Sequence, residues 1–168
     1  MLDAELVELA ARVGARLQQQ ELLLATAESC TGGLVAGAIT AIAGSSGWFD
    51  RGFVTYTNEA KQEMLGVPAS ALASFGAVSE PVARAMAEGA LVNSTAGCAV
   101  AVTGIAGPGG ATAGKPVGMV CFGWALRGQP TTVATVHFPG DRAAIRALSV
   151  RHALEGILIR LDSYLARG

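Results

Sequence analysis

The stretch Leu22-Leu-Leu-Ala-Thr-Ala-Glu-Ser-Cys-Thr-Gly-Gly33 joins an apolar run to two adjacent glycines and decides the fold of this chain. Leu22 to Ala27 has the length and flanks of a buried strand. Gly32 and Gly33 permit a tight turn, and the apolar residues from Leu34 to Ala43 suit the inner face of a helix. The pattern therefore predicts a strand that turns directly into a helix.

The turn carries two neighbouring side chains that are capable of nucleophilic attack. A hydroxyl at Ser29 would lie among free backbone N–H groups at the positive end of a helix dipole, a place that favours an anion or an oxyanion. Capping of the helix by Ser29 or Thr31 is the commoner role of such residues and is an equally open reading here. Cys30 is the rival nucleophile, but such cysteines usually use a histidine base, and His137 and His152 lie outside the polar loops. Ser29 is therefore preferred over Cys30.

Helical and strand patterns alternate on both sides of this turn. Apolar spacing and capping signals predict helices over residues 2–17, 34–43, 59–65 (with Asn58 as N-cap), 79–93 and 141–165. Strands are predicted over residues 22–27, 52–57, 98–103, 117–126 and 131–138, with the last two forming a hairpin around Arg127-Gly128. Such alternation predicts an α/β fold, a three-layer α/β/α sandwich on a mixed β-sheet, formed as one domain over residues 1–168.

Composition narrows the class of protein. Of the 168 residues, 51% are hydrophobic and 15% charged, and the formal net charge is −1. The chain has no basic stripe with interleaved aromatic residues, which argues against nucleic acid as a partner. So few charges on so apolar a chain predict that some surface is buried between subunits, in a homodimer or a higher homo-oligomer.

Other features concern the compartment. The first residues are acidic and lack the basic segment of a secretory signal. The longest apolar stretch, Gly33 to Gly44, is too short and glycine-rich to cross a bilayer, so no membrane partner is expected. Three cysteines lie far apart and are typical of free thiols, which predicts a cytoplasmic protein without a metal site.

Polar and glycine-rich residues follow several of the predicted strands. Because ligands of open α/β sheets bind at the carboxyl ends of strands, these segments are expected to form one site. They are residues 28–31, 56–61 and 103–110, with residues 140–142 at the start of the last helix.

Lys61 is a candidate general base. With Asn58 as N-cap, it would occupy the third helical position, where the helix dipole disfavours an ammonium ion. Partial burial there would lower its pKa toward neutrality, and a neutral amine can deprotonate a serine. A solvated surface lysine is the competing interpretation. The chain has only one other lysine, Lys115.

Lys115 ends a segment that imitates a nucleotide phosphate loop. Residues 109–115 match G-x-x-x-x-G-K, but Pro116 stands where Mg²⁺ binding needs Ser or Thr, and it prevents a helix from starting there. The ATPase interpretation is therefore rejected, although such a loop can still cradle a phosphate. Arg142 would suit a substrate phosphate, or would pair with Asp141.

Several segments together resemble the C-terminal domain of the competence-damage-inducible CinA family. They are Ala27-Glu-Ser-Cys-Thr-Gly-Gly33, Gly44-Ser-Ser46, Trp48-Phe49, Arg51-Gly-Phe-Val-Thr-Tyr-Thr-Asn-Glu-Ala-Lys61, Gly76-Ala-Val-Ser-Glu-Pro81, Val102-Thr-Gly-Ile-Ala-Gly-Pro108, Lys115-Pro-Val-Gly118 and Gly140-Asp-Arg142. The resemblance covers nearly the entire chain. The chain is similar to the stand-alone members of the family, which are nicotinamide-nucleotide amidohydrolases.

This resemblance implies a reaction and assigns roles within it. The reaction would be hydrolysis of nicotinamide mononucleotide to nicotinate mononucleotide and ammonia, in pyridine-nucleotide recycling. Ser29 matches the family's nucleophile and Lys61 its general base. Tyr56 belongs to the same active site and is expected to orient one of them by a hydrogen bond, while Arg142 matches a phosphate contact.

The remaining site residues complete the expected mechanism. Backbone amides near Thr31 and Gly32 are expected to hold the oxyanion. Thr103, Gly104 and Gly107 are expected to bind the substrate, and neither cofactor nor metal is needed. The alternative is a non-catalytic interaction protein acting in competence or recombination, as the family's name suggests.

Overall fold

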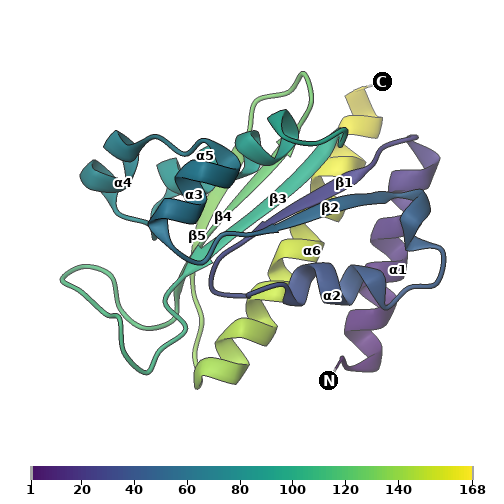
Figure 1. Ribbon diagram of the computed structural model, residues 1–168. Helices are drawn as coiled ribbons and strands as arrows, with labels where there is room; N and C mark the ends of the chain where they lie inside the picture. The colour runs from purple at the N-terminus through teal and green to yellow at the C-terminus, as the bar shows by residue number, and fades with distance from the viewer. Residues whose placement is uncertain (1, 168) are drawn as a thin grey trace.

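The computed structural model describes residues 2–167 and places five strands in one mixed sheet (Figure 1). The elements are α1 (Ala4–Gln19), β1 (Leu24–Glu28), α2 (Leu34–Thr40), the 3-10 turn η1 (Ser45–Gly47), β2 (Phe49–Val54), α3 (Asn58–Leu65), α4 (Ala69–Phe75), α5 (Glu80–Val92), β3 (Cys98–Gly104), β4 (Met119–Leu126), β5 (Thr132–His137) and α6 (Arg142–Arg167). The strand order is β2-β1-β3-β4-β5. β1 runs parallel to β2 and β3, whereas β4 runs antiparallel to β3 and β5.

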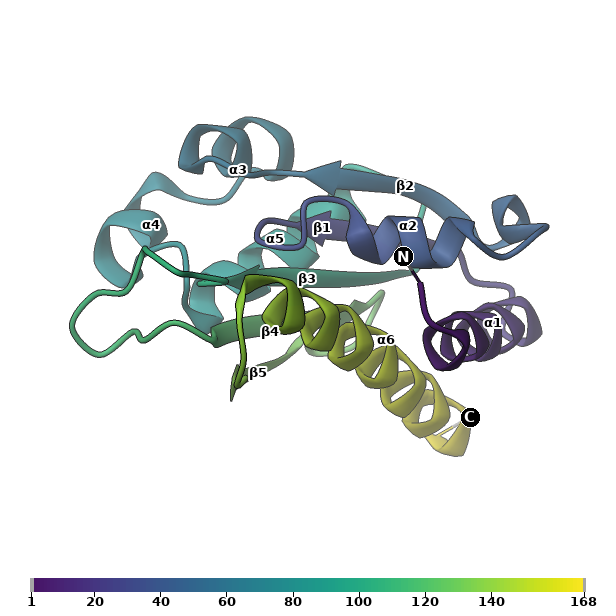
Figure 2. The ribbon, with the colours of Figure 1, turned by 90° about the horizontal axis from the view of Figure 1, so that it is seen from below.

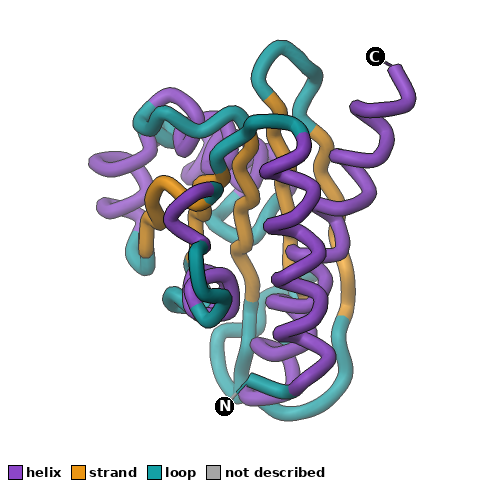
Figure 3. Tube along the Cα trace, turned by 90° about the vertical axis from the view of Figure 1, so that its right-hand side faces the viewer, coloured by secondary structure: helices purple, strands orange, loops and turns teal. Residues whose placement is uncertain are grey.

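Helices cover both faces of this sheet. One layer contains α1, α2 and α6, and the opposite layer contains α3, α4 and α5 (Figure 2). In the side view, α1 and α6 lie against each other along their face of the sheet (Figure 3). The predicted three-layer sandwich on a mixed sheet is therefore confirmed, including the β4–β5 hairpin.

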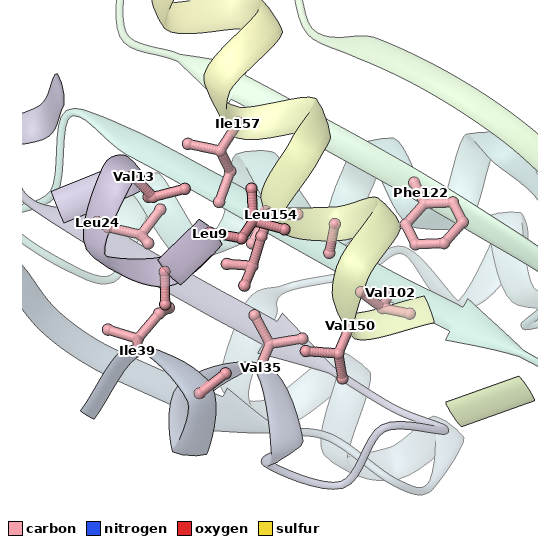
Figure 4. Packing of buried hydrophobic residues seen from close by; sticks show 14 of the residues in the cluster. Leu9, Val13, Leu24, Val35, Ile39, Val102, Phe122, Val150, Leu154 and Ile157 are labelled. Carbon is pink, nitrogen blue, oxygen red and sulfur yellow. The ribbon is translucent and has the colours of Figure 1, made fainter. Parts of the chain in front are cut away.

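The two faces differ in side-chain size because successive strand residues point to opposite sides. On the α1–α2–α6 side, Val100, Val102 and Phe122 pack with Leu9, Val13 and Leu154 of the helices (Figure 4). The α5 side carries mainly alanines from the strands, namely Ala25, Ala27, Ala99, Ala101 and Ala125. These small side chains let α5 lie close to the central strands.

Gly123 of β4 lies directly against α5, and this close packing gives a stability prediction. A Cβ atom there would lie 2.6 Å from the carbonyl oxygen of Ala83. We expect Gly123→Ala to lower the free energy of unfolding by about 1–3 kcal/mol through overpacking, as measured by urea denaturation. Gly37→Ala is the matched control, because no atom lies within 4 Å of a Cβ at that helical position. Equal stability of the two variants would contradict this packing.

Some predicted boundaries move, and two of the shifts affect the site. β2 spans Phe49–Val54 instead of 52–57, so residues 55–57 form the loop between β2 and α3. Thr57, not Asn58, is the N-cap of α3, and its hydroxyl accepts a hydrogen bond from the Ala60 amide at 3.0 Å. Threonine and asparagine both cap well, and the earlier strand end gives the first of them this position. Lys61 is accordingly the fourth helical residue and remains in the first turn.

Other differences are smaller. The helix α4 was not predicted, because its seven residues bury only Leu72 and have too little apolar periodicity to stand out. α2 ends at Thr40, three residues before the predicted boundary. Within residues 2–167, none of the helices combines the length and the apolar character needed to traverse a lipid bilayer.

Candidate active site

A cavity of about 220 Å³ lies where β1 and β3 end and α3 begins. It brings together six residues expected from the sequence to form one site, namely Ser29, Tyr56, Lys61, Thr103, Gly104 and Arg142. Cys30, Asn58, Ala77, Val78 and Ala106 complete the lining. The carboxyl ends of two parallel strands thus converge on one hollow, as the rule for open α/β sheets requires.

Ser29 and Lys61 form a direct pair in this cavity. The Lys61 Nζ atom lies 3.1 Å from Ser29 Oγ and donates to the Thr55 carbonyl oxygen at 3.0 Å. The side chains are almost entirely buried, since Lys61 is 1% and Ser29 8% exposed. The amide of Thr55 donates to the Glu28 carbonyl and fixes the position of this acceptor relative to β1.

Burial lowers the pKa of Lys61 below its ordinary value of 10.5. A charge on Cys30 would oppose this effect, but burial raises the pKa of that thiol to about 11, so the thiol is neutral near pH 7. No salt bridge involves Lys61 among residues 2–167. In its neutral form the Lys61 amine can direct one N–H to the Thr55 carbonyl. Its lone pair is then available to accept a hydrogen bond from the Ser29 hydroxyl.

The geometry favours Ser29 over Cys30 as the nucleophile. Ser29 is hydrogen-bonded to a potential base, whereas Cys30 has a raised pKa caused mainly by desolvation. Because the thiolate is the reactive form of cysteine, this thiol is inert near neutral pH.

Glu28 is a buried carboxylate that holds the turn between β1 and α2. Its Oε1 accepts from the Thr31 hydroxyl at 2.6 Å and from two backbone amides, and its Oε2 accepts from a third amide at 3.0 Å; these amides are those of Gly33, Val35 and Ala36. Neither Ser29 nor Thr31 caps α2, because Glu28 satisfies those orphan amides from the preceding strand.

The backbone amides of the turn divide into occupied and free donors. The Ser29 amide donates to the Val102 carbonyl, and the Gly32 amide donates to the Ser29 carbonyl at 3.0 Å. Among residues 2–167, the amides of Cys30 and Thr31 donate to no backbone carbonyl. The Gly32 amide is thus engaged within the turn.

Tyr56 and Arg142 meet at the rim of the cavity. The Arg142 Nη2 donates to the Tyr56 hydroxyl at 3.0 Å, and its Nη1 donates to the Gly107 carbonyl at 2.8 Å. Tyr56 makes no hydrogen bond with Ser29 or Lys61 within the described chain, in contrast to the expected orienting role. Asp141 caps α6 through the Ala144 amide, so it is not the partner of Arg142.

The hydroxyl of Thr103 is occupied by a structural contact. It donates to the Ala77 carbonyl at 2.9 Å and thereby fixes the segment before α5 against the end of β3. Gly104 has no room for a side chain, because a Cβ would lie 2.7 Å from Val120 Cγ2. Thr103 and Gly104 both line the cavity, whereas Thr31 and Gly32 are not among its lining residues.

A second hollow of about 730 Å³ adjoins the cavity and shares Ala106 and Arg142 with it. Pro108, Val117 and Arg146 also line this hollow. Lys115, which ends the imitation phosphate loop, donates to the Phe75 carbonyl at the end of α4. Across residues 2–167, no three His, Cys, Asp or Glu side chains gather as metal ligands would.

Three contributors to the site were given no role by sequence reasoning. Glu28 was quoted only as part of the turn, although a carboxylate directly before a strand-to-helix turn is a recognisable capping signal. The Thr55 carbonyl is a backbone group and leaves no trace in residue types. Arg146 lies one helical turn after Arg142, and this spacing could have placed it on the same face of α6.

The chain is similar to several known proteins. The sequence profile of the CinA C-terminal domain matches residues 6–161. A CinA-like protein of Akkermansia muciniphila is 56% identical over 84% of this chain, which spans only 34% of that protein. The nicotinamide-nucleotide amidohydrolase PncC of Escherichia coli K12 is 52% identical, with 92% of this chain and 94% of that protein covered. The crystal structure of competence/damage inducible protein CihA from Agrobacterium tumefaciens superposes with a TM-score of 0.92 at 50% identity, covering 96% of this chain and 98% of that one.

Proposed function

This chain belongs to the CinA C-terminal domain family, and on that premise we propose that it hydrolyses the carboxamide of nicotinamide mononucleotide to nicotinate mononucleotide and ammonia. The observation that carries the proposal is the buried contact of 3.1 Å between Ser29 Oγ and Lys61 Nζ inside a cavity. The Escherichia coli relative, whose name gives this substrate class, covers 92% of the chain. A buried lysine without a carboxylate partner favours an enzyme over a non-catalytic interaction protein, because burying an amine costs stability and groups perturbed in this way cluster at functional sites.

Acylation is the first chemical step. Neutral Lys61 accepts the proton of the Ser29 hydroxyl while Oγ forms a bond to the carboxamide carbon. The tetrahedral intermediate then expels its amino group, which takes the proton from Lys61 and leaves as ammonia when the C–N bond breaks. Ser29 is left as an ester of the nicotinate moiety.

Deacylation repeats the sequence with water. Lys61, neutral again, removes a proton from a water molecule as its oxygen attacks the ester carbon. The C–O bond to Ser29 breaks, and the proton returns from Lys61 to the Ser29 oxygen. The net reaction consumes one water molecule and requires neither metal nor cofactor.

The free amides of Cys30 and Thr31 supply the oxyanion donors in this mechanism. They follow the nucleophile directly in the turn and donate to no backbone carbonyl among residues 2–167. Donors of this kind each contribute about 3 kcal/mol to stabilisation of the transition state.

The adjoining hollow is the proposed site for the ribose and phosphate. Arg142 lines both hollows, and its guanidinium is held in place by hydrogen bonds to the Gly107 carbonyl and the Tyr56 hydroxyl. Its guanidinium fork suits a phosphate monoester. Thr103 and Gly104 then form the wall against which the pyridine ring lies.

The state of the cysteines supports the proposal of a cytoplasmic location. The three cysteines are buried free thiols, as suits a protein of the reducing cytoplasm. Self-association stays a prediction from composition, to be tested by sedimentation of the purified chain.

Ammonia release distinguishes this function from the alternative. We expect the purified protein to release one ammonia per nicotinamide mononucleotide consumed, measured with a coupled enzymatic assay. Nicotinamide riboside, which lacks the phosphate, should react at least about tenfold less efficiently, because losing contacts to a charged group costs more than about 1.4 kcal/mol. A folded protein that releases no ammonia from either compound would instead support a binding role, and equal rates for both would remove the phosphate site.

A further inference from the structure

Arg146 of α6 contacts the turn that carries Ser29. Its Nε donates to the Cys30 carbonyl oxygen at 3.1 Å, and its Nη2 donates to the Thr31 carbonyl oxygen at 3.3 Å. Arg142, one turn earlier on the same helix, instead contacts Tyr56 and Gly107 at the cavity rim. Two arginines of one helix therefore serve different parts of the site.

The contact with the Cys30 carbonyl has a consequence for the amide of Thr31, two residues after the proposed nucleophile. The peptide unit that contains the Cys30 carbonyl also contains the Thr31 N–H. A hydrogen bond from a cation to the carbonyl draws electron density from the peptide nitrogen, so the N–H becomes a stronger donor. That N–H donates to no backbone carbonyl among residues 2–167 and is free to bind an oxyanion.

Arg146 adds to the contacts of Glu28 that hold this turn, one of which is with the Thr31 hydroxyl. Gly32 and Gly33 have φ values of +56° and +102°, so the chain after Thr31 has the freedom of two glycines in the left-handed region. Glu28 fixes the far end of this segment through the amides of α2. The carbonyls of Cys30 and Thr31, at the near end, are held by Arg146.

We propose that Arg146 is a positioning residue for the hydrolysis, which fixes and polarises the Cys30–Thr31 peptide unit so that its N–H stabilises the oxyanion. The inference rests on the proposed function, since it presupposes attack by Ser29. It assigns Arg146 to the rate of the chemical step and not to substrate affinity, although the side chain also borders the adjoining hollow.

The test compares Arg146→Ala with Arg151→Ala in the full chain. Arg151 lies on the same helix but pairs with Glu5 and Asp3, away from the site. With nicotinamide mononucleotide, we expect Arg146→Ala to lower kcat by about 10- to 100-fold, somewhat less than the loss of a whole oxyanion donor, and to change KM by less than about threefold. Arg151→Ala should keep the kcat of the unmodified protein.

Two further readouts separate positioning from a merely structural role. Added guanidinium ion, below denaturing concentration, should restore part of the kcat of Arg146→Ala and leave that of Arg151→Ala unchanged. Nicotinaldehyde mononucleotide, which can form a hemiacetal with Ser29, should bind Arg146→Ala more weakly by the same factor as the loss of kcat/KM. The binding of nicotinate mononucleotide should not change.

Three results would overturn the inference: an unchanged kcat, a loss confined to KM, or a loss of kcat with full affinity for the aldehyde. Each would leave the proposed function intact, provided that the unmodified protein releases ammonia and Ser29→Ala does not. Failure of that prior condition would instead reject the proposed function itself.

Discussion

Ser29→Ala is expected to abolish turnover of nicotinamide mononucleotide, with kcat lower by about 10⁴- to 10⁶-fold, while the protein stays folded. The variant removes the one hydroxyl that Lys61 contacts among residues 2–167. Within the same residues the Ser29 hydroxyl has no second hydrogen-bond partner, so little stability should be lost. Ammonia release and the unfolding transition in urea measure the two effects separately.

Cys30→Ala is the matched control for this variant. The thiol is adjacent and equally buried, but its pKa is raised to about 11, so it is not a nucleophile near neutral pH. We expect its kcat to stay within about threefold of the unmodified value, since the amide of residue 30 is retained. Full activity of Ser29→Ala combined with inactivity of Cys30→Ala would reverse the assignment.

Trapping of the covalent intermediate tests the role of Ser29 independently. Rapid mixing with substrate followed by acid quenching should reveal a chain whose mass has increased by that of the acyl group. The adduct should be absent from Ser29→Ala and present in Cys30→Ala. Its location on any residue other than Ser29 would contradict the mechanism.

The layered fold was predictable because each of its determinants is local. The apolar run before Ser29, the paired glycines after it and the hairpin around Gly128 each constrain the backbone at one place. The small helix α4 was missed because one buried leucine cannot produce a periodic signal. The N-cap of α3 was misplaced because Thr57 and Asn58 have nearly the same capping preference.

The sequence predicts which residues line the site but not which hydrogen bonds they make. Side chains at strand ends could be expected to converge, and Ser29, Lys61 and Arg142 do line one cavity. The partner of each polar atom depends on tertiary contacts, which residue types do not encode. Tyr56 thus contacts Arg142 instead of Ser29 or Lys61, and Glu28 accepts from the Thr31 hydroxyl that could have capped the helix.

Lys61→Met is expected to lower kcat/KM by about 10³- to 10⁴-fold, at the upper end of what a general base contributes. Methionine has nearly the same length and fills the buried space, so the loss comes from the missing amine. Lys61→Arg should be equally inactive, because a guanidinium cannot give up its proton in the working range. Activity of either variant above a tenth of the original would contradict a catalytic base at this position.

The pH dependence follows from the lowered pKa of Lys61. Only the neutral amine accepts the Ser29 proton, so kcat/KM should rise with pH and level off at a pKa below 10.5. Burial is the cause of this shift, and Cys30 cannot oppose it while its thiol is neutral. A rate that does not change with pH below 10.5 would remove Lys61 from the mechanism.

The free energy of unfolding should also depend on pH because of Lys61, and the direction of this dependence can be predicted. Between the lowered pKa of Lys61 and its unfolded value of 10.5, the unfolded chain binds more protons than the folded one, so the free energy of unfolding rises with pH. Below the lowered pKa the full cost of burying the amine persists, and above 10.5 it vanishes. Lys61→Met lacks this group, so its stability relative to the unmodified protein should fall as pH rises through that window. Urea denaturation across the window measures this difference, and its lower edge should coincide with the rising limb of kcat/KM because one proton governs both.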